Sequence, residues 1–323
     1  MKKILFTLVC LLGMSVAANA ASKSDIVLQH GSNITVYNAE DFPAAMEAAV
    51  DGDVIFLGEG IYPSFGINKK ITVQGVGEET MIEGNITIDI PDEPTLTAPV
   101  LQNMQINGNL SINSVTKGLG IKQCHFTDTF STIYFSAKTY DAYIDRCNID
   151  LLGSLNIGYT YEETVTINGV SNTVAYPYIK GLTVTNSIIS KVWGSTLLAN
   201  VYFVNCAITQ KGQPGLGIVI NSIVSTNESS VLDNTKFINS FLFATIQSSC
   251  TTTNCYETGK YLKYDSEEIV TNNYLGNDGT IIGPLGGTTP YTLVPDVPQV
   301  TVSNFKVDHQ KQELNVTLTA TPE

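Results

Sequence analysis

The stretch from Val184 to Val224, VTNSIISKVWGSTLLANVYFVNCAITQKGQPGLGIVINSIV, contains one short pattern three times. Each copy has an apolar residue, then an Asn two positions later, then Cys or Ser, and an apolar residue two positions after that. Similar copies lie on both sides of the stretch. The six copies are IKQCHF (Ile121–Phe126), IDRCNI (Ile144–Ile149), VTNSII (Val184–Ile189), FVNCAI (Phe203–Ile208), VINSIV (Val219–Val224) and FINSFL (Phe237–Leu242).

The spacing of the copies indicates the architecture. Their Cys or Ser positions, at 124, 147, 187, 206, 222 and 240, are separated by 23, 40, 19, 16 and 18 residues. A separation near twenty residues suits one coil of a β-solenoid, in which each coil buries its apolar face only against its neighbours. The 40-residue interval then holds an extra coil or a long loop with the sequence YTYEETVTINGVSNTVAYPY. We therefore predict an all-β solenoid.

The polar positions of the pattern predict what happens at each corner. Asn tolerates the left-handed backbone conformation that a tight corner needs. We expect the corner residues to hydrogen-bond along the axis as a ladder, and the small residue that follows each of them to point inward and stack. The predicted ladder consists of Asn186, Asn205, Asn221 and Asn239, with Cys124, Cys147 and Cys206 at inward positions.

The first part of the chain resembles a segment of a known protein family. Asn38–Ile88, NAEDFPAAMEAAVDGDVIFLGEGIYPSFGINKKITVQGVGEETMIEGNITI, combines a short Ala-rich helix, a Gly-Asp turn, and segments of the form "I.L..G.Y" and "I.K.ITI.G.G". In order and spacing it resembles the opening of right-handed parallel β-helix proteins of the pectate-lyase-like superfamily, and the repeats extend the resemblance to about Leu242. No specific enzyme family matches. The resemblance implies a single-stranded right-handed parallel β-helix over residues 21–290, with a helix over about residues 41–51 that caps its open end.

The two ends of the chain differ from the repeats. Lys2 and Lys3, the apolar run ILFTLVCLLGMSVA and the Ala18-Asn-Ala20 site are typical of a bacterial signal peptide over residues 1–20. This predicts export to the periplasm, cell surface or exterior of a Gram-negative bacterium, and no later segment is long enough to span a membrane. Residues 291–323 alternate like a strand pair, which we expect to form a β-hairpin that covers the last coil.

The net negative charge of the chain limits the classes of molecule that it is expected to bind. The chain has a formal net charge of −13, and removal of Lys2 and Lys3 with the leader makes it −15. Such a field makes nucleic acid and anionic membranes poor partners, and we predict no nucleic-acid binding. The sequence does not indicate an oligomeric state.

Five cysteines remain after residue 20. Cys250 and Cys255, in CTTTNC, share a polar segment, and in an oxidising compartment they are candidates for a local disulfide. Cys124 and Cys147 lie on what would be adjacent coils, so a bridge between them is an alternative to two buried thiols. We predict no metal site at the cysteines, because no further soft ligands lie nearby.

The resemblance also implies where catalysis would be sought. Lyases of this superfamily use clustered acids for Ca²⁺ and a Lys or Arg base, and the hydrolases use a set of Asp residues, commonly with a Gly-His-Gly segment that this chain lacks. The only arginine, Arg146, falls at a corner position, for which we expect a structural role. The candidate catalytic residues are Asp128, Asp141, Asp145, Asp150 and Lys138. These residues also alternate with apolar ones as a solvated strand face would, and Ca²⁺ is expected only if the protein is a lyase; otherwise no cofactor is predicted.

Aromatic residues suggest a different function. They lie between the corner motifs, in segments expected to form an extended face and its border, where flat rings suit the apolar faces of sugars. The candidates for glycan binding are Tyr134, Tyr159, Tyr161, Tyr176, Tyr178 and Trp193. Tyrosine is also an ordinary strand residue. Our leading prediction is a non-catalytic protein that binds a polysaccharide or cell-surface glycan or acts as an adhesin. The alternatives are a lyase or glycoside hydrolase acting on uronate-containing polysaccharide, and a structural scaffold that binds another protein.

Overall fold

A computed structural model describes residues 26–91, 99–167, 170–194, 200–209, 215–225, 231–257, 259–292, 299–308 and 313–321. The chain forms two compact units, Met1–Tyr291 and Thr292–Glu323. The first is a parallel β-solenoid of about eight turns with a short N-terminal helix, as predicted from the repeats. The predicted signal peptide lies outside the described residues.

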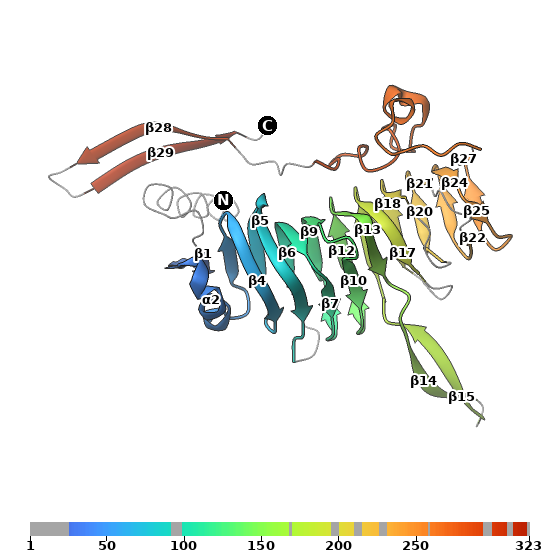
Figure 1. The fold of residues 1–323 in the computed structure, drawn as a ribbon, viewed down its shortest axis with the longest axis horizontal. Coiled ribbons are helices and arrows are strands. Elements are labelled where there is room, and N and C mark those ends of the chain that lie inside the picture. The colour runs from blue at the N-terminus through green and yellow to red at the C-terminus, as the bar shows by residue number, and fades with distance from the viewer. Residues whose placement is uncertain are drawn as a thin grey trace. The chain divides into compact units, whose positions relative to one another are not determined.

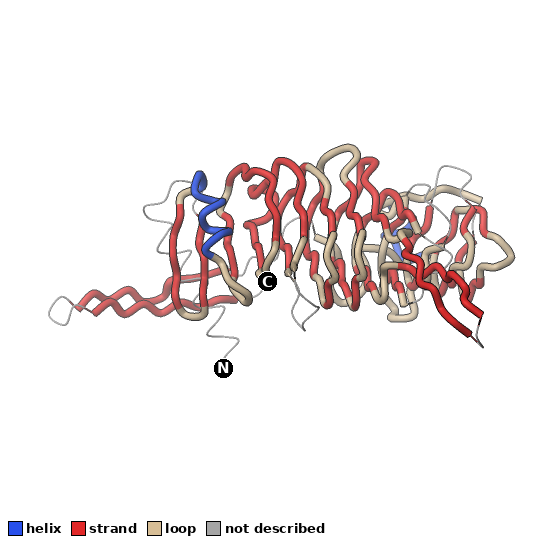
Figure 2. The backbone as a smooth tube through the Cα atoms, turned by 90° about the horizontal axis from the view of Figure 1, so that it is seen from below, coloured by secondary structure: helices blue, strands red, loops and turns tan. Residues whose placement is uncertain are grey.

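The solenoid strands pair with the equivalent strands of neighbouring coils (Figures 1 and 2). In chain order they are β3 (Val54–Leu57), β4 (Gly60–Ile67), β5 (Thr72–Ile88), β6 (Val100–Asn107), β7 (Leu110–Ile112), β9 (Gly120–Phe126), β10 (Thr132–Phe135), β12 (Ala142–Asp145), β13 (Asn148–Asn156), β16 (Leu182–Thr185), β17 (Ile188–Trp193), β18 (Val201–Val204), β19 (Ala207–Ile208), β20 (Ile218–Ile220), β21 (Ile223–Ser225), β23 (Lys236–Ile238), β24 (Phe241–Phe243), β26 (Thr251–Thr253) and β27 (Tyr256–Glu257). Two short parallel pairs add to the coils: β8 (Thr116–Lys117) with β11 (Thr139–Tyr140), and β22 (Val231–Leu232) with β25 (Thr245–Ile246).

The core follows directly from the repeat. The apolar residue that opens each copy of the pattern stacks on its equivalent in the next coil, and all six of these residues are fully buried. The column runs Ile121, Ile144, Val184, Phe203, Val219 and Phe237. Because side chains alternate between the two sides of a strand, every second residue joins such a column. The core is therefore continuous along the axis, as expected when each coil is completed only by its neighbours.

The N-terminal end is closed by a helix together with an antiparallel strand pair. A 3₁₀ turn, η1 (Ala39–Asp41), leads into α2 (Phe42–Ala48), whose Phe42 and Ala45 are buried against the core. Strand β1 (Ile26–His30) pairs antiparallel with β3 and with β2 (Asn33–Tyr37). The helix is shorter than the predicted 41–51, because Ala49 is extended and the backbone N–H of Val50 instead donates to the Asp53 carboxylate.

The 40-residue interval between two copies of the pattern contains one coil with an inserted hairpin, and not an extra coil. Strands β14 (Thr160–Ile167) and β15 (Val170–Pro177) pair antiparallel and project from the solenoid body (Figure 1). Cys147 and Ser187 consequently lie on adjacent coils, since β12 pairs directly with β16.

The segment after the last coil, which we call the strap (Leu262–Tyr291), does not leave the solenoid. It contains a π-helical turn, η2 (Ile269–Asn273), and runs back along the coils toward the N-terminal end, in orange-red in Figure 1. The repeats did not predict the packing of the strap on the coils, because none of the six copies of the pattern lies in this segment.

The second unit is an antiparallel hairpin of β28 (Gln299–Asp308) and β29 (Glu313–Thr321), which confirms the predicted strand pair. That it covers the last coil stays a prediction. None of the helices in the described ranges has the length and apolar character needed to cross a membrane.

Candidate functional site

A row of exposed and half-buried side chains lies on one outward face of the solenoid. Tyr134 of β10 pairs in register with Asn156 of β13, which pairs with Trp193 of β17. The ring of Tyr159 stacks on that of Tyr134, with 6.5 Å between centroids and 25° between planes. Trp193 is 37% exposed and Tyr159 43% exposed. We call Tyr134, Asn156, Tyr159 and Trp193 the aromatic platform.

A glycine lets the chain turn out of the platform into the hairpin. A Cβ atom on Gly158 would lie 2.6 Å from the carbonyl oxygen of Gly194 and 3.0 Å from that of Trp193. The absence of a side chain therefore permits the close approach of the two segments that carry Tyr159 and Trp193. The rings of Tyr159 and Trp193 are thus both positioned beside the coils of β13 and β17.

The base of the hairpin carries a second group of rings, the tyrosine cluster (Tyr161, Tyr176 and Tyr178). Tyr161 lies 5.8 Å from Tyr176 and 5.4 Å from Tyr178, measured between ring centroids. The Nζ atom of Lys138 lies 4.2 Å from the centroid of Tyr161, and that of Lys180 lies 5.2 Å from the centroids of both Tyr161 and Tyr176. Such cation–π contacts hold the base of the hairpin against the coils.

Lys138 is further occupied by an ion pair. Its Nζ atom lies 3.1 Å from Oε1 of Glu163, and this hydrogen bond raises the pKa of Lys138. Lys138 makes no ion pair or hydrogen bond with Asp128, Asp141 or Asp145 in the described part of the chain. Among the described residues, Lys138 is therefore paired with Glu163 and with none of the predicted aspartates.

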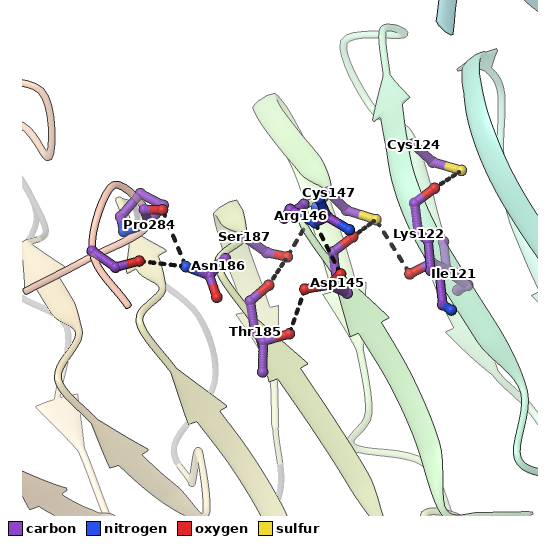
Figure 3. Close-up of polar contacts among 11 residues, drawn as sticks. Ile121, Lys122, Cys124, Asp145, Arg146, Cys147, Thr185, Asn186, Ser187 and Pro284 are labelled. Atoms are coloured by element: carbon purple, nitrogen blue, oxygen red, sulfur yellow. Dashed lines mark hydrogen bonds and ion pairs between the residues drawn. The ribbon is translucent and has the colours of Figure 1, made fainter. Parts of the chain in front are cut away.

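Each described aspartate of the catalytic set has its own local setting. Asp128 is exposed in the turn before β10, and Asp141 is an exposed corner residue with φ of 51°. Asp145 accepts hydrogen bonds from Nε of Arg146 at 3.0 Å and from Oγ1 of Thr185 at 2.7 Å (Figure 3). The side chain of Asp150 lies outside the described residues. Within those residues, no three His, Cys, Asp or Glu side chains gather as a metal site would require.

The corner column has the backbone that the sequence predicted. Left-handed φ values of 45° to 56° occur at Asn103, Gln123, Arg146, Asn186, Asn205, Asn221, Asn239 and Asn254. Asn103 and Asn254 extend the column beyond the six copies recognised in the sequence. Sequence reasoning missed Asn103 because Met104 follows it in place of Cys or Ser, and it missed Asn254 because the preceding strand is three threonines.

The predicted hydrogen bonds from one corner Asn to the next are replaced at Asn186 and Asn221, whose side chains hydrogen-bond to the strap instead. The Nδ2 atom of Asn186 donates to the carbonyl oxygens of Pro284 (3.3 Å) and Gly286 (2.7 Å), as Figure 3 shows in part. Asn221 exchanges hydrogen bonds with Asn277, donating to its Oδ1 atom and accepting from its backbone N–H. The prediction was wrong there because the strap supplies the hydrogen-bond partners of both amides.

The axial hydrogen bonds run instead through the inward position that follows the corner. Oγ of Ser187 accepts from the backbone N–H of Cys147 at 3.0 Å, and Oγ of Ser222 accepts from that of Cys206 at 3.0 Å. Oγ of Ser240 accepts from the N–H of Ser222 at 3.1 Å. Each of these hydroxyls also donates to the carbonyl oxygen two residues earlier in its own chain. The ladder therefore connects small inward residues, and the predicted inward positions are confirmed as buried.

The described cysteines are all free thiols. Burial raises the pKa of Cys206 to about 12 and raises that of Cys124 well above its usual range. Cys255 follows the corner residue Asn254, so it lies in the ladder position of the last coil and not in a loop. The structure contains neither the Cys250–Cys255 bridge nor the Cys124–Cys147 bridge, and the first stays a prediction for an oxidising compartment.

Comparisons with known proteins add no family. A scan with protein-family models found no match, and neither curated proteins nor solved structures showed a significant similarity. The resemblance to the pectate-lyase-like superfamily is supported only as far as the parallel β-solenoid itself.

Proposed function

We propose that this protein is an exported β-solenoid that binds a glycan on its aromatic platform. The observation that carries the proposal is the in-register row of Tyr134, Asn156 and Trp193, with Tyr159 stacked on Tyr134. Trp193 and Tyr159 are exposed, and Tyr134 and Asn156 are half-buried. Aromatic rings with one exposed face provide a flat apolar surface, and the C–H faces of sugar rings pack on such a surface.

The spacing of the rings suits a chain-like ligand. Tyr134 and Trp193 lie on strands separated by one intervening coil, which places them about 10 Å apart along the axis. That distance has the length of a few sugar units. Asn156 lies between the rings. Its Oδ1 atom accepts from the backbone N–H of Gly158 at 3.3 Å, and its Nδ2 atom can donate to a sugar hydroxyl. A linear glycan aligned with the axis would meet ring, amide and ring in succession.

The experiment uses the chain from Ala21 to Glu323 and a panel of neutral and acidic polysaccharides, with and without calcium. Retention of the protein on one polysaccharide, without release of oligosaccharides, supports the proposal. Loss of retention in Trp193→Ala, but not in the matched control Tyr202→Ala on a different face, assigns the binding to the platform. Equal retention of the two variants overturns the assignment. Released oligosaccharides, detected by mass spectrometry, would instead support the lyase or hydrolase alternative.

A further inference from the structure

The strap is bound by a built surface on the solenoid flank, which is separate from the aromatic platform. Asn186 donates two hydrogen bonds to strap carbonyls, and Asn221 both donates to and accepts from Asn277. The carbonyl oxygen of Asn221 also accepts from the N–H of Gly283 at 2.7 Å. Asn186 and Asn221 are only 4% and 3% exposed, so these amides belong to a buried interface.

An apolar column beside the corner completes this surface. Ile188, Ala207, Ile223 and Phe241 each follow an inward residue directly, so alternation directs them outward, yet all four are buried. Ile223 and Phe241 pack with Leu262, Ile269 and Ile282 of the strap in an apolar cluster distinct from the main core. We call the corner asparagines and this column together the flank.

The fit of the strap to the flank is specific in shape. A Cβ atom on Gly276 would lie 2.6 Å from Cγ of Asn221, and one on Gly287 would lie 2.2 Å from Nδ2 of Asn205. A Cβ atom on Gly283 would lie 2.6 Å from Cδ1 of Ile223. Three glycines of the strap therefore stand where side chains of the flank leave no room for another carbon atom.

The strap is joined covalently to the rest of the molecule only at its two ends. On one side it follows the last coil through an exposed segment at Gly259, where an added Cβ atom would meet nothing within 4 Å. On the other side the chain continues after Tyr291 into the separate C-terminal unit. The contacts that position the strap are therefore made with the flank and not with the connecting segments. A strap from a second copy of the protein could make the same contacts, as in the exchange of identical segments between protomers.

We propose that the flank is a chain-recognition surface whose partner is the strap of a second copy, so that two molecules are joined when they exchange straps. The same hydrogen bonds, apolar contacts and glycine positions serve the exchanged strap. The tether gives the molecule's own strap a high effective concentration, so exchange requires concentrated protein or an opened connection.

The test opens that connection in the full chain. A protease recognition sequence is inserted after Gly259 in unlabelled and in isotope-labelled protein, both are cleaved, and the two are mixed under native conditions. We expect the cleaved strap to stay bound, and native mass spectrometry to show unlabelled solenoids that carry labelled straps. Separation of strap from solenoid upon cleavage, with the solenoid still folded by circular dichroism, would overturn the proposal. So would a mixture in which no mixed species form.

Variants at the corner asparagines test whether their side-chain amides hold the strap on the flank. Asn186→Gly combined with Asn221→Gly keeps the left-handed corners and removes the amides, so we expect the bound strap to dissociate at least about tenfold more readily. Asn239→Gly is the matched control, because Asn239 has the same corner conformation with φ of 45° and, among the described residues, no hydrogen bond to the strap. An equal effect of the control would contradict the proposal.

A second measurement tests the proposal without cleavage, in case the cleaved protein unfolds. Deletion of Gly259 and Lys260 from the intact chain shortens the connection, which disfavours return of the strap to its own flank. We expect this variant to be a dimer by light scattering, and to become a monomer when Asn186→Gly and Asn221→Gly are added. A folded monomer from the deletion alone would overturn the proposal.

Discussion

The side-chain nitrogen of Asn186 lies 2.7 Å from the carbonyl oxygen of Gly286, a residue 100 positions later in the chain. The same asparagine holds a left-handed backbone with φ of 48°. One residue type therefore performs two tasks in this solenoid. It turns the chain at the corner, and at Asn186 and Asn221 its amide also fixes the strap that covers the flank.

Gly287→Ala tests the close packing of the strap. The new Cβ atom would lie 2.2 Å from Nδ2 of the buried Asn205, and the backbone at Gly287 has φ of +79°. Gly279→Ala is the control, since Gly279 has φ of +76° and open space around it. We expect the control to lower the free energy of unfolding by about 1 kcal/mol, from backbone strain alone, and Gly287→Ala to lower it by about 3 kcal/mol. Equal values in urea titrations would contradict the packing.

Ser222→Ala tests the inward ladder. Oγ of Ser222 accepts from the N–H of Cys206 and donates to the carbonyl oxygen of Ile220, and the side chain is fully buried. Removal leaves a buried donor without its partner, which costs about 1–3 kcal/mol of stability. The exposed Ser136→Ala should change the free energy of unfolding by less than about 0.5 kcal/mol. Thermal or urea unfolding of both variants measures the difference.

Alkaline pH should release the end of the strap. Burial raises the pKa of Tyr291 to about 12, whereas a phenol in an unfolded chain titrates at about 10. Between these values the docked form retains a proton that the released form loses, so docking is favoured below about pH 10 and weakens as the pH rises toward 12. The raised pKa values of Lys138 and Cys206 likewise make the folded protein less stable as the pH rises.

Protease cleavage within the strap measures this release between pH 9 and pH 12. We expect cleavage of the natural protein to accelerate across that range, and that of Tyr291→Phe to change less, because phenylalanine has no proton to lose. Identical pH profiles for the two proteins would show that Tyr291 does not control the release.

The coils and their corners were predictable because they depend on local chemistry. An Asn at a left-handed corner and a small residue after it are properties of one coil, repeated along the sequence. The hairpin also had a local signal, since Asn168-Gly169 between Ile167 and Val170 is typical of a two-residue hairpin turn. The length of the interval alone could not distinguish a coil from a loop, because it suits both.

The packing of the strap could not be predicted from local sequence, because it is a contact between distant segments. The sequence of the flank nevertheless indicates that something covers it. Adjacent apolar residues at Ile188-Ile189, Ile223-Val224 and Phe241-Leu242 break the alternation of a strand with one side in water. In the earlier coils the equivalent outward residues are the polar His125 and Asn148. The strap ends at Tyr291, whose side chain bonds to Asn148, so the pattern marks how far the cover extends.

The catalytic candidates show the limit of grouping residues by sequence. Asp128, Asp141 and Asp145 are close in the chain, but a turn, a corner and a strand separate their settings. The rings of the aromatic platform could be listed in advance, because aromatic residues in strand segments are visible in the sequence. Asn156 could not, because its place between the rings depends on the register of the coils. The sequence could not separate these rings from the tyrosine cluster, because that separation depends on the register of the coils and on the hairpin.

The central claim, glycan binding at the platform, is tested most directly by the fluorescence of Trp193, the only tryptophan in the chain. The protein is titrated with the polysaccharide that retains it, and Tyr134→Ala is titrated in parallel. We predict a saturable change in emission for the natural protein, and at least about tenfold weaker binding for the variant. Retention of the glycan with no change in Trp193 emission, and with equal affinity for the variant, would contradict the account.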